Sequence, residues 1–457
     1  MLTPGKYIVL GLGITGCALI DFLIEQKVEV VAFDEEEEEK FKKVTDKYSK
    51  EYSKQKINFF FKNFPKKVFE DCQGVFVSPG VPLTRSWIQE AKTKKIPIIG
   101  ELELASRYLQ QGVVAVTGTN GKSTTVTLLD SILKEGGLKS GLKGNIGSPL
   151  ITALAEPPKD IYVVEVSSYQ LETIESFHPK ISVLLNITED HLERYKDCDD
   201  YARAKARIFM NQTANDTFIY NADDPYCLRM SKASPARPIP FSLVNSFVEG
   251  GFVDSEEMVM RIGEREDRYS LAECSLKGLH NQENMLAAIL SAMILGVKKD
   301  SIAKALANFK SLSHRMELAG VYEGISFYDD SKGTNVGAVV MSLASFEKGV
   351  ILILGGRDKG GDYSPLKSLI SGKVKALIVL GEAKLKILEK LEGLCPTYSV
   401  ENIKEAVEKS FEMGSAEDVV LLSPACSSFD QYKNYAERGR DFQKWVSYFG
   451  ERKKRTK

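Results

Sequence analysis

The chain has 457 residues, enough for about three domains that each bury a core of their own. Its 61 lysine and arginine residues nearly balance its 62 aspartate and glutamate residues, so its net charge argues against binding to nucleic acid or an anionic membrane. Seven dispersed cysteines without a C-x-x-C pair argue against a disulfide framework or a zinc site. Glycines interrupt the apolar N-terminus, which does not read as a signal peptide, and no apolar run reaches membrane-spanning length. We therefore expect a cytoplasmic protein with reduced thiols.

The first segment, residues 1–100, begins with the pattern of a nucleotide-binding unit. A strand at 6–10 runs into GLGITG at 11–16, a helix follows, and a second strand at 28–33 ends on Asp34. A glycine turn between strand and helix, with an acidic residue after the next strand, favours a nucleotide diphosphate site. The simpler alternative is a tight turn that only packs the helix on the strand. A later strand ends in SPGVP at 78–82, a loop at the sheet edge where such folds bind ligands.

The central segment, residues 101–311, is predicted to be organised around the turn GTNGKST at 118–124. A buried strand at 113–116 precedes this turn and an apolar helix follows it. Such a turn aims backbone N–H groups and the positive end of a helix at one point, with Lys122 as a cation and Ser123 as a hydroxyl suited to Mg²⁺. It is a shortened P-loop, with two residues before its Gly-Lys pair where the consensus has four. We expect a polyphosphate to bind here, since a turn serving only as scaffold would leave Lys122 without a role.

The next strand of this segment carries a carboxylate, Glu165, among apolar residues. A buried glutamate without a partner is costly, so Glu165 is expected to face either a Mg²⁺ ion beside the P-loop or a structural lysine. The turn GNIG at 144–147 could bring Asn145 to a ligand.

A histidine and a lysine follow in this segment. NITEDHLERY at 186–195 places His191 among carboxylates, where it is either a metal or acid–base group or a capping or core histidine. Lys205 lies between Arg203 and Arg207 on an alanine-rich helix. These cationic neighbours would lower the pKa of its amine, although an exposed helix lysine is the default alternative.

The end of the central segment is predicted to hold β-hairpins and an apolar helix. Alternating patterns and a Gly-Gly pair indicate hairpins between residues 245 and 275. HNQEN at 280–284 precedes the apolar helix 285–295, with Asn281 as a plausible helix cap. Asn284, one turn further on, is more easily explained by a ligand than by helix preference.

The last segment, residues 312–457, follows a polar hinge that contains SHR at 313–315. Four predicted strands each run into a loop rich in glycine or hydroxyl residues, which indicates a doubly wound domain with a polar carboxyl edge. These loops start at Asp329, Gly355, Gly381 and Ser423. A helix over 430–448, with aromatic residues at near-helical spacing, is expected to face the core.

Taken together, these motifs resemble those of the Mur ligase family of peptidoglycan synthesis, over nearly the whole chain. The motifs that carry the resemblance are GLGITG, SPGVP, GTNGKST, GNIG, EVSSYQLE at 165–172, NITEDHLERY, HNQEN, SHR, DSKGTN at 330–335 and LLSPACSSFDQYKNY at 421–435. The fold implied is α/β in three domains: a Rossmann-like N-terminal domain (1–100), a central P-loop ATPase-like domain (101–311) and a C-terminal doubly wound Rossmann-like domain (312–457).

The resemblance also implies an activity. The expected enzyme is an ATP-dependent amide ligase that joins D-glutamate to UDP-N-acetylmuramoyl-L-alanine through an acyl phosphate, with two Mg²⁺ ions. Its first domain would bind the UDP part of the substrate, its second ATP, and its third the incoming amino acid. We expect a monomer that needs neither nucleic acid nor a membrane.

By the same resemblance, each ligand has a predicted set of residues. The UDP site would comprise Leu12, Ile14, Thr15, Asp34, Gly80 and Asn145. ATP would contact Gly118, Thr119, Asn120, Gly121, Lys122, Ser123, Thr124, Asn284, Arg315 and Asp330. The first Mg²⁺ would bind Ser123 and Glu165, and the second His191 and Lys205, the latter as an N-carboxylated lysine (a carbamate). The catalytic residues would be Lys122, Glu165, His191 and Lys205. D-Glutamate would contact Lys332, Thr334, Lys359, Ser423 and Phe429.

Two positions depart from the family pattern. Glu35 and Glu36 follow Asp34 where relatives can carry a hydroxyl residue and an arginine, and Gly333 follows Lys332 where alanine is commoner, which predicts a more flexible loop.

Several other functions fit parts of the sequence. A dinucleotide-dependent oxidoreductase would leave Lys122, Glu165 and His191 unexplained, and the N-terminal glycine turn argues against a folylpolyglutamate synthase. A ligase of the same family that adds another amino acid remains open. A non-catalytic nucleotide-binding module is disfavoured while Lys122, Glu165, His191 and Lys205 are all present.

Overall fold

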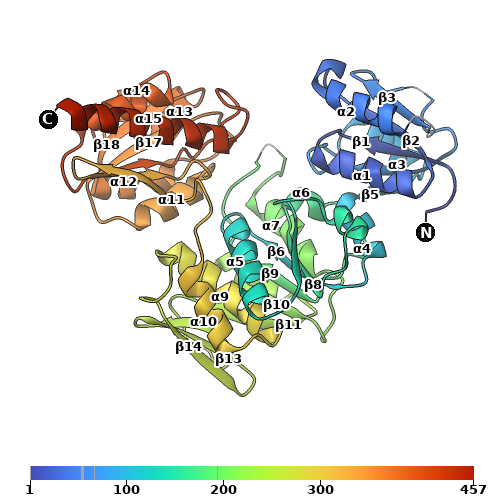
Figure 1. Ribbon diagram of the computed structural model, residues 1–457, viewed down its shortest axis with the longest axis horizontal. Coiled ribbons are helices and arrows are strands. Elements are labelled where there is room, and N and C mark those ends of the chain that lie inside the picture. Colours follow the sequence, from blue (N-terminus) through green and yellow to red (C-terminus); the bar gives the residue numbers. More distant parts are fainter. Residues whose placement is uncertain (1, 53–55, 66, 193, 457) are drawn as a thin grey trace.

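The computed structural model describes residues 2–52, 56–65, 67–192 and 194–456, arranged in three lobes with a β-sheet in each (Figure 1). The predicted three-domain α/β fold is confirmed. Helices cover sheets made mainly of parallel strands, which explains why most strands read as continuous apolar runs rather than alternating patterns.

The N-terminal lobe holds a fully parallel sheet in the order β3-β2-β1-β4-β5. The glycine turn at its first strand is fixed by sterics: a Cβ on Gly16 would lie 1.8 Å from the carbonyl oxygen of Gly11, so only glycine lets the first helix pack this closely. The elements are β1 (Lys6–Leu10), α1 (Ile14–Glu25), β2 (Glu29–Asp34), α2 (Glu38–Glu51), β3 (Ile57–Phe61), β4 (Cys72–Val77), α3 (Ser86–Thr93) and β5 (Ile98–Gly100).

The central lobe is built on nine strands in the order β14-β13-β12-β11-β10-β9-β6-β8-β7. The hairpins expected near its end are confirmed as the antiparallel run β12-β13-β14, which packs beneath α9. Its first elements are α4 (Glu101–Tyr108), β6 (Gly112–Thr117), α5 (Lys122–Glu135), β7 (Ser140–Gly144), η1 (Leu150–Ala155), β8 (Ile161–Glu165), α6 (Ser168–Leu171), β9 (Ile181–Leu184), α7 (Cys198–Ala206) and η2 (Arg207–Phe209). There follow β10 (Thr217–Asn221), α8 (Pro225–Ser231), β11 (Arg237–Ser242), β12 (Gly250–Asp254), β13 (Glu257–Ile262), β14 (Arg265–Ser270), α9 (Leu279–Ile294) and α10 (Lys299–Asn308).

The C-terminal lobe holds six strands in the order β15-β16-β20-β17-β18-β19, of which only the β15-β16 pair is antiparallel. Helices α11 to α13 pack on one face of the sheet, and α14 and α15 on the other. The elements are β15 (Glu317–Tyr322), β16 (Ile325–Asp329), α11 (Val336–Ala344), β17 (Val350–Gly355), η3 (Ser364–Leu366), α12 (Lys367–Lys373), β18 (Val374–Leu380), α13 (Lys384–Leu391), β19 (Thr397–Ser399), α14 (Ile403–Met413), β20 (Val419–Leu422) and α15 (Tyr435–Thr456).

Two local predictions were wrong. Asn281 does not cap α9, because the helix begins at Leu279 with Gly278 in the cap position, and the Asn281 amide instead donates to the carbonyl of Lys277 at 2.9 Å. The last helix begins at Tyr435 rather than at residue 430, because residues 427–434 form a loop whose backbone and side chains bond to other loops of the lobe. None of the helices in the described part of the chain combines the length and apolar character needed to span a bilayer.

Candidate active site

Two cavities lie at the carboxyl edge of the central sheet, where loops of different lobes meet. The first, of about 550 Å³, is bounded by the P-loop, by α9 and by the start of the C-terminal lobe. The second, of about 480 Å³, brings together residues from all three lobes. They include Gly80 of the N-terminal lobe, Lys122, Asn145, Glu165, His191 and Lys205 of the central lobe, and Lys332, Thr334, Lys359 and Phe429 of the C-terminal lobe.

The P-loop turn separates these cavities and has the expected strand–turn–helix geometry. Gly121 caps α5 with φ +85°, and a Cβ there would lie 2.2 Å from the side-chain oxygen of Asn284, so glycine is required on both counts. The Lys122 ammonium folds back onto the turn and donates to the carbonyls of Gly118 and Thr119 at 2.8 and 2.9 Å. Burial lowers the pKa of Lys122, an effect that Glu165 partly opposes. The lysine is therefore held at the mouth of the turn.

Glu165 ends β8 beside the P-loop, as expected. Burial would raise the pKa of Glu165, but Lys122 and a 2.7 Å hydrogen bond from the Asn145 amide lower it below the usual value, so the side chain is a carboxylate. Its Oε2 atom is buried and has no hydrogen-bond partner in the part of the chain that the structure describes. A buried carboxylate oxygen of this kind, next to the Ser123 hydroxyl, fits a Mg²⁺ ion.

Lys205 is buried, with 1 % of its surface exposed, so the alternative of an exposed helix lysine is excluded. Its amine donates to the carbonyl of Gly118 at 2.8 Å and lies 4.5 Å from the centre of the Tyr201 ring. Burial, and then the neighbouring Lys122, lower its pKa well below the ordinary value. The pKa of Lys205 is thus lowered, as expected, but by burial and Lys122 rather than by its neighbours on the helix. The side chain of Arg207, one of those neighbours, instead donates to the carbonyls of Leu171 and Ile174.

Opposite the P-loop, the hinge before β15 brings Arg315 into the site. The Arg315 guanidinium donates to the Ser123 hydroxyl at 2.7 Å across the lobe boundary. The residues on either side, His314 and Met316, both adopt left-handed backbone conformations, with φ of +62° and +50°. Asp330 lies behind this hinge, and burial raises its pKa to about 6. The Lys332 amine stands 4.1 Å from the centre of the Tyr435 ring, and burial followed by Arg315 lowers its pKa to about 8.

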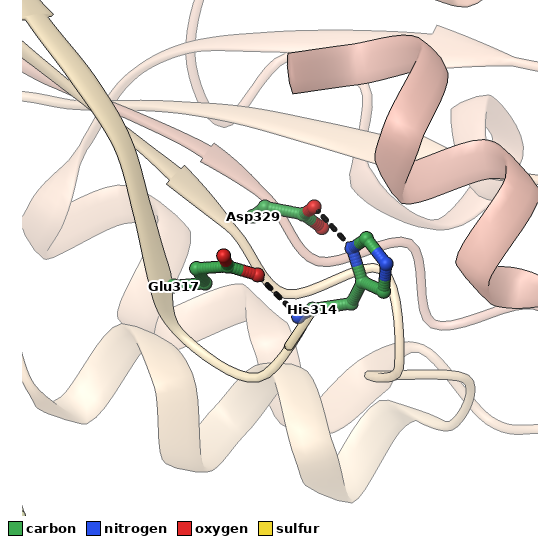
Figure 2. Close-up of side chains that lie close together, drawn as sticks. All are labelled: His314, Glu317 and Asp329. Atoms are coloured by element: carbon green, nitrogen blue, oxygen red, sulfur yellow. Dashed lines mark hydrogen bonds and ion pairs between the residues drawn. The ribbon is translucent and has the colours of Figure 1, made fainter. Parts of the chain in front are cut away.

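A cluster of one half-buried and two buried residues fixes the hinge to the C-terminal lobe. Figure 2 shows His314, Glu317 and Asp329 pointing toward one another, and their potential ligand atoms lie within 4.8 Å. Hydrogen bonds already join these residues. The backbone N–H of His314 donates to Glu317 at 2.7 Å, and the Nδ1 atom of His314 lies 2.6 Å from Asp329 Oδ2. The Gln443 amide of α15 donates to both carboxylates, at 3.0 and 2.9 Å. Because donors occupy these oxygens, the cluster is a structural anchor for the loop that carries Arg315.

One residue predicted to contact the amino acid lies elsewhere. Ser423 is fully buried, and its hydroxyl donates to Asp330 Oδ2 at 2.7 Å rather than lining the second cavity. The loop that Ser423 opens supplies other cavity residues, which the sequence did not single out: Ser427, Ser428 and Tyr435. The same contact explains Gly333, because a Cβ there would lie 2.6 Å from the Asp330 carboxylate and 2.7 Å from the Ser423 hydroxyl.

The residues predicted to bind UDP fall into two groups. Gly80 and Asn145 line the second cavity, whereas Leu12, Ile14, Thr15 and Asp34 are not among its lining residues and sit at the glycine turn of the N-terminal lobe. There the Asp34 carboxylate accepts the backbone N–H of Leu12 at 2.7 Å, and the Ile14 side chain is 75 % exposed. The following residue, Glu35, forms an ion pair with Arg85 at 2.7 Å.

Asp190 and Tyr169 are among the other cavity residues that were not predicted. Asp190 is a nearly buried carboxylate that accepts hydrogen bonds from Lys359 and Asn335 of the C-terminal lobe, at 3.3 and 3.2 Å. Burial would raise its pKa, but Lys359 and His191 lower it, so Asp190 is ionised. Tyr169 lies 2.7 Å from the Nδ1 atom of His191. The sequence shows the motifs that contain Asp190 and Tyr169. It does not show that Asp190 bonds Lys359 and Asn335, or that Tyr169 contacts His191.

The chain has three α/β lobes, and their loops meet around a P-loop, an ionised buried glutamate and a group of lysines. This combination defines an ATP-dependent ligase of the three-domain type. The chain belongs to the Mur ligase family. Family models match residues 5–100 (Mur ligase MurD-like, N-terminal domain), 116–292 (Mur ligase middle domain) and 314–426 (Mur ligase, glutamate ligase domain).

Individual relatives agree with this family. The chain is 43 % identical over 439 residues to a UDP-N-acetylmuramoylalanine--D-glutamate ligase of Geotalea daltonii, and 40 % identical to one of Syntrophotalea carbinolica, in both cases over 96 % of each chain. Its fold is similar to those of a pseudomurein peptide ligase type C from Methanothermus fervidus (TM-score 0.61, 19 % identity, 97 % of this chain and 100 % of that one) and of a UDP-N-acetylmuramate-alanine ligase from Thermotoga maritima (TM-score 0.59, 19 % identity, 97 % and 99 %).

Proposed function

We propose that this chain is an ATP-dependent ligase that forms an amide between D-glutamate and the alanyl carboxylate of UDP-N-acetylmuramoyl-L-alanine. The choice of substrates is supported by the relatives that match along 96 % of the chain and carry that activity in their names. The observation that carries the chemistry is the second cavity, where the P-loop lysine, a metal-suited glutamate and three C-terminal basic or hydroxyl side chains meet a loop of the N-terminal lobe. A cavity lined by all three lobes can hold three reactants at once.

In the proposed reaction, the alanyl carboxylate attacks the γ-phosphorus of ATP, and ADP leaves with the electrons of the broken P–O bond. The amine of D-glutamate then attacks the acyl carbon, phosphate leaves, and the amine loses a proton as the amide forms. Both the carboxylate and the triphosphate are anions, so the site must offset their repulsion. Lys122 and Arg315 carry positive charge at the P-loop, and bound Mg²⁺ would supply further charge neutralisation at the phosphates.

We propose that Ser123 and Glu165 hold one Mg²⁺ ion and that His191 and Lys205 hold a second. Lys205 would do so as an N-carboxylated lysine, since a neutral amine is needed to add CO₂ and the lowered pKa of Lys205 favours the neutral form. The modified side chain would also place a negative charge among buried cations, next to Lys122.

The remaining ligands are assigned by lobe. UDP would bind at Leu12, Ile14, Thr15 and Asp34 in residues 1–100, with Gly80 and Asn145 reaching toward the reacting end. ATP would bind residues 101–311 at the P-loop and Asn284, with Arg315 and Asp330 closing over it. D-Glutamate would bind residues 312–457 through Lys332, Thr334, Lys359 and Phe429, with the Ser428 hydroxyl in place of Ser423. We expect a monomer that acts in the cytoplasm, where ATP and nucleotide-linked sugars are made.

The test is phosphate release from ATP by the purified protein in the presence of Mg²⁺ and UDP-N-acetylmuramoyl-L-alanine. D-Glutamate should support release, whereas L-glutamate, L-lysine and diaminopimelate should not. Release with one of the other amino acids instead would assign the chain to a different ligase of the same family. No release with any of them would overturn the proposal.

A further inference from the structure

The two ring nitrogens of His191 have different surroundings. Nδ1 lies 2.7 Å from the hydroxyl oxygen of Tyr169, with the two ring centres 4.9 Å apart and tilted by 58°. Nε2 is on the side of Asp190, 3.6 Å from its Oδ2 atom, and both residues line the second cavity. Nδ1 therefore faces a phenol, and Nε2 faces a carboxylate.

A neutral imidazole carries one proton, so the partner of one nitrogen decides what the other can do. A nitrogen that binds a metal must present its lone pair, and the proton then sits on the opposite nitrogen, where it needs an acceptor. A tyrosine hydroxyl has lone pairs to accept that proton. We propose that Tyr169 is a positioning residue: it accepts the Nδ1–H of His191 and so presents Nε2, unprotonated, to the second Mg²⁺. This inference rests on the proposed function, in which His191 is a ligand of that ion.

The position of Tyr169 is fixed from two sides. Its helix, α6, starts with a capping box in which the Ser167 hydroxyl accepts the backbone N–H of Gln170 and the Gln170 side chain accepts that of Ser167. The Arg194 guanidinium lies 4.5 Å from the centre of the Tyr169 ring. Glu172 holds Arg194 through both carboxylate oxygens.

The backbone of His191 adopts an uncommon conformation. Its φ is +59°, in the left-handed region that is uncommon for residues other than glycine. The backbone N–H donates to Asp190 at 3.0 Å, which fixes the main chain but not the ring. The contact with Tyr169 holds the ring at Nδ1.

Arg194, which packs on Tyr169, also contacts the N-terminal lobe. The Arg194 guanidinium also lies 3.5 Å from the carbonyl of Val81, in the loop that carries Gly80 into the second cavity. The orientation of His191 is thereby linked, through Tyr169 and Arg194, to the loop expected to approach the sugar-nucleotide substrate.

The opposite arrangement makes a different prediction. If Tyr169 donated its proton to Nδ1, Nε2 would carry the imidazole proton toward Asp190 and could not bind a metal. Nitrogen-15 NMR of the metal-free protein labelled at its four histidines separates the two cases, with a His191→Gln variant to assign the signals. We expect the Nδ1–H tautomer for His191 in the natural sequence and a mixture of tautomers in Tyr169→Phe. An Nε2–H tautomer in the natural sequence would overturn the proposal.

Metal affinity gives the second measurement. With a non-hydrolysable ATP analogue bound, Mn²⁺ should occupy two sites, and Tyr169→Phe should weaken the second by about 10- to 100-fold while leaving the first unchanged. The matched control is Tyr195→Phe, which removes a hydroxyl from the same aromatic group, where it donates to Glu172 at 2.7 Å. An equal loss in the control, or an unchanged second site in Tyr169→Phe, would overturn the proposal. Because neither readout requires turnover, failure of the proposed ligase reaction would be seen separately, as absence of phosphate release by the natural protein.

Discussion

At the scale of single residues, we expect the largest loss of activity from substitution of Lys122. Its amine is held 2.8 to 2.9 Å from two carbonyls of its own turn, in position to exchange them for phosphate oxygens. We predict that Lys122→Ala lowers phosphate release with D-glutamate by at least about 100-fold, since removing one charge-stabilising group from a closed site costs that much or more. Lys134→Ala removes an exposed lysine from the same helix, where it pairs with the buried Asp130 at 2.7 Å, away from the turn, and should retain full activity. Similar losses in both variants would contradict the assignment.

Lys205 gives a second residue-level prediction. Lys205→Ala should be inactive, because it removes both the buried amine and any carbamate built on it. A small carboxylate such as acetate or formate, or bicarbonate, should restore part of the activity by occupying the vacated space as an anion. Rates are measured over a concentration series of each anion, with circular dichroism to confirm folding. A folded variant that no anion rescues would count against the carbamate.

At the scale of elements, buried glutamates hold α4, the first helix after the N-terminal lobe, against the rest of the central lobe. Glu101 is 1 % exposed, and its Oε1 accepts the backbone N–H of Ile151 at 2.6 Å while its Oε2 has no hydrogen-bond partner in the part of the chain that is described. Burial raises its pKa to about 7, against the direction of the backbone hydrogen bonds from Ile151 and Leu150. The charged form is thus disfavoured in the folded protein.

This raised pKa predicts how stability changes with pH. Between about pH 4.5 and pH 7 the folded state keeps a proton on Glu101 that the unfolded state has lost, so this group's contribution to stability falls as pH rises through that window. Glu101→Gln removes the dependence. Its melting temperature relative to the natural sequence should therefore rise from about pH 5 to about pH 8, by the equivalent of about 1 to 3 kcal/mol. A difference in melting temperature between Glu101→Gln and the natural sequence that stays the same at all pH values would contradict a raised pKa for Glu101.

The hinge loop before β15 supplies the next prediction. Gln443 on α15 donates to both Glu317 and Asp329, and these hold the strained loop that presents Arg315 to the P-loop. Gln443→Leu leaves two carboxylate oxygens without this donor, a loss of about 1 to 3 kcal/mol. We expect a lower melting temperature and a higher KM for ATP, with KM for D-glutamate changed less. Lys444→Leu alters the exposed neighbour on the same helix and should change neither KM.

At the scale of the whole molecule, the fold was predictable because its signals are local. Each strand that ends in a glycine or hydroxyl loop can be recognised within about ten residues, and the mainly parallel sheets follow from apolar strands separated by helices. The errors fell where a boundary depends on packing: α9 begins at Leu279 because Gly278 supplies the cap, and α15 begins late because bonds to other loops of the lobe hold residues 427–434 in a loop.

The site was predictable only as far as its motifs extend along the chain. Lys122 follows one of two neighbouring strands and Glu165 ends the other, and their motifs already suggested one phosphate and metal site, whereas the bond between Asn145 and Glu165 was not predicted. Asp190 and Lys359 are 169 positions apart and meet only because the C-terminal lobe packs on the central one. The burial of Lys205 and the hidden position of Ser423 likewise depend on tertiary packing, which no local pattern reports.

The contact between these two lobes can be tested through Asn335, which has two tasks. Its side-chain oxygen caps α11 by accepting the backbone N–H of Ala338 at 2.8 Å. Its amide nitrogen donates across the boundary to Asn120 of the P-loop turn at 3.1 Å and to Asp190 at 3.2 Å. The side-chain oxygen also accepts from the Asn120 amide at 3.3 Å, so it caps the helix and, together with the nitrogen, joins the two lobes.

Two substitutions separate these tasks, because serine and aspartate both cap helices about as well as asparagine. Asn335→Ser removes the donor, whereas Asn335→Asp also sets a negative charge beside Asp190, where two anions repel each other strongly in a poorly hydrated site. The melting temperature should therefore change little in the serine variant, whereas repulsion between the two anions should lower it in the aspartate variant. We expect kcat/KM for D-glutamate to fall by about 10- to 150-fold in the serine variant, the range for a lost hydrogen bond to a charged group, and further in the aspartate variant. Equal activity in the two variants would show that the Asn335 amide does not engage Asp190 during the reaction, and that the two lobes are held together elsewhere.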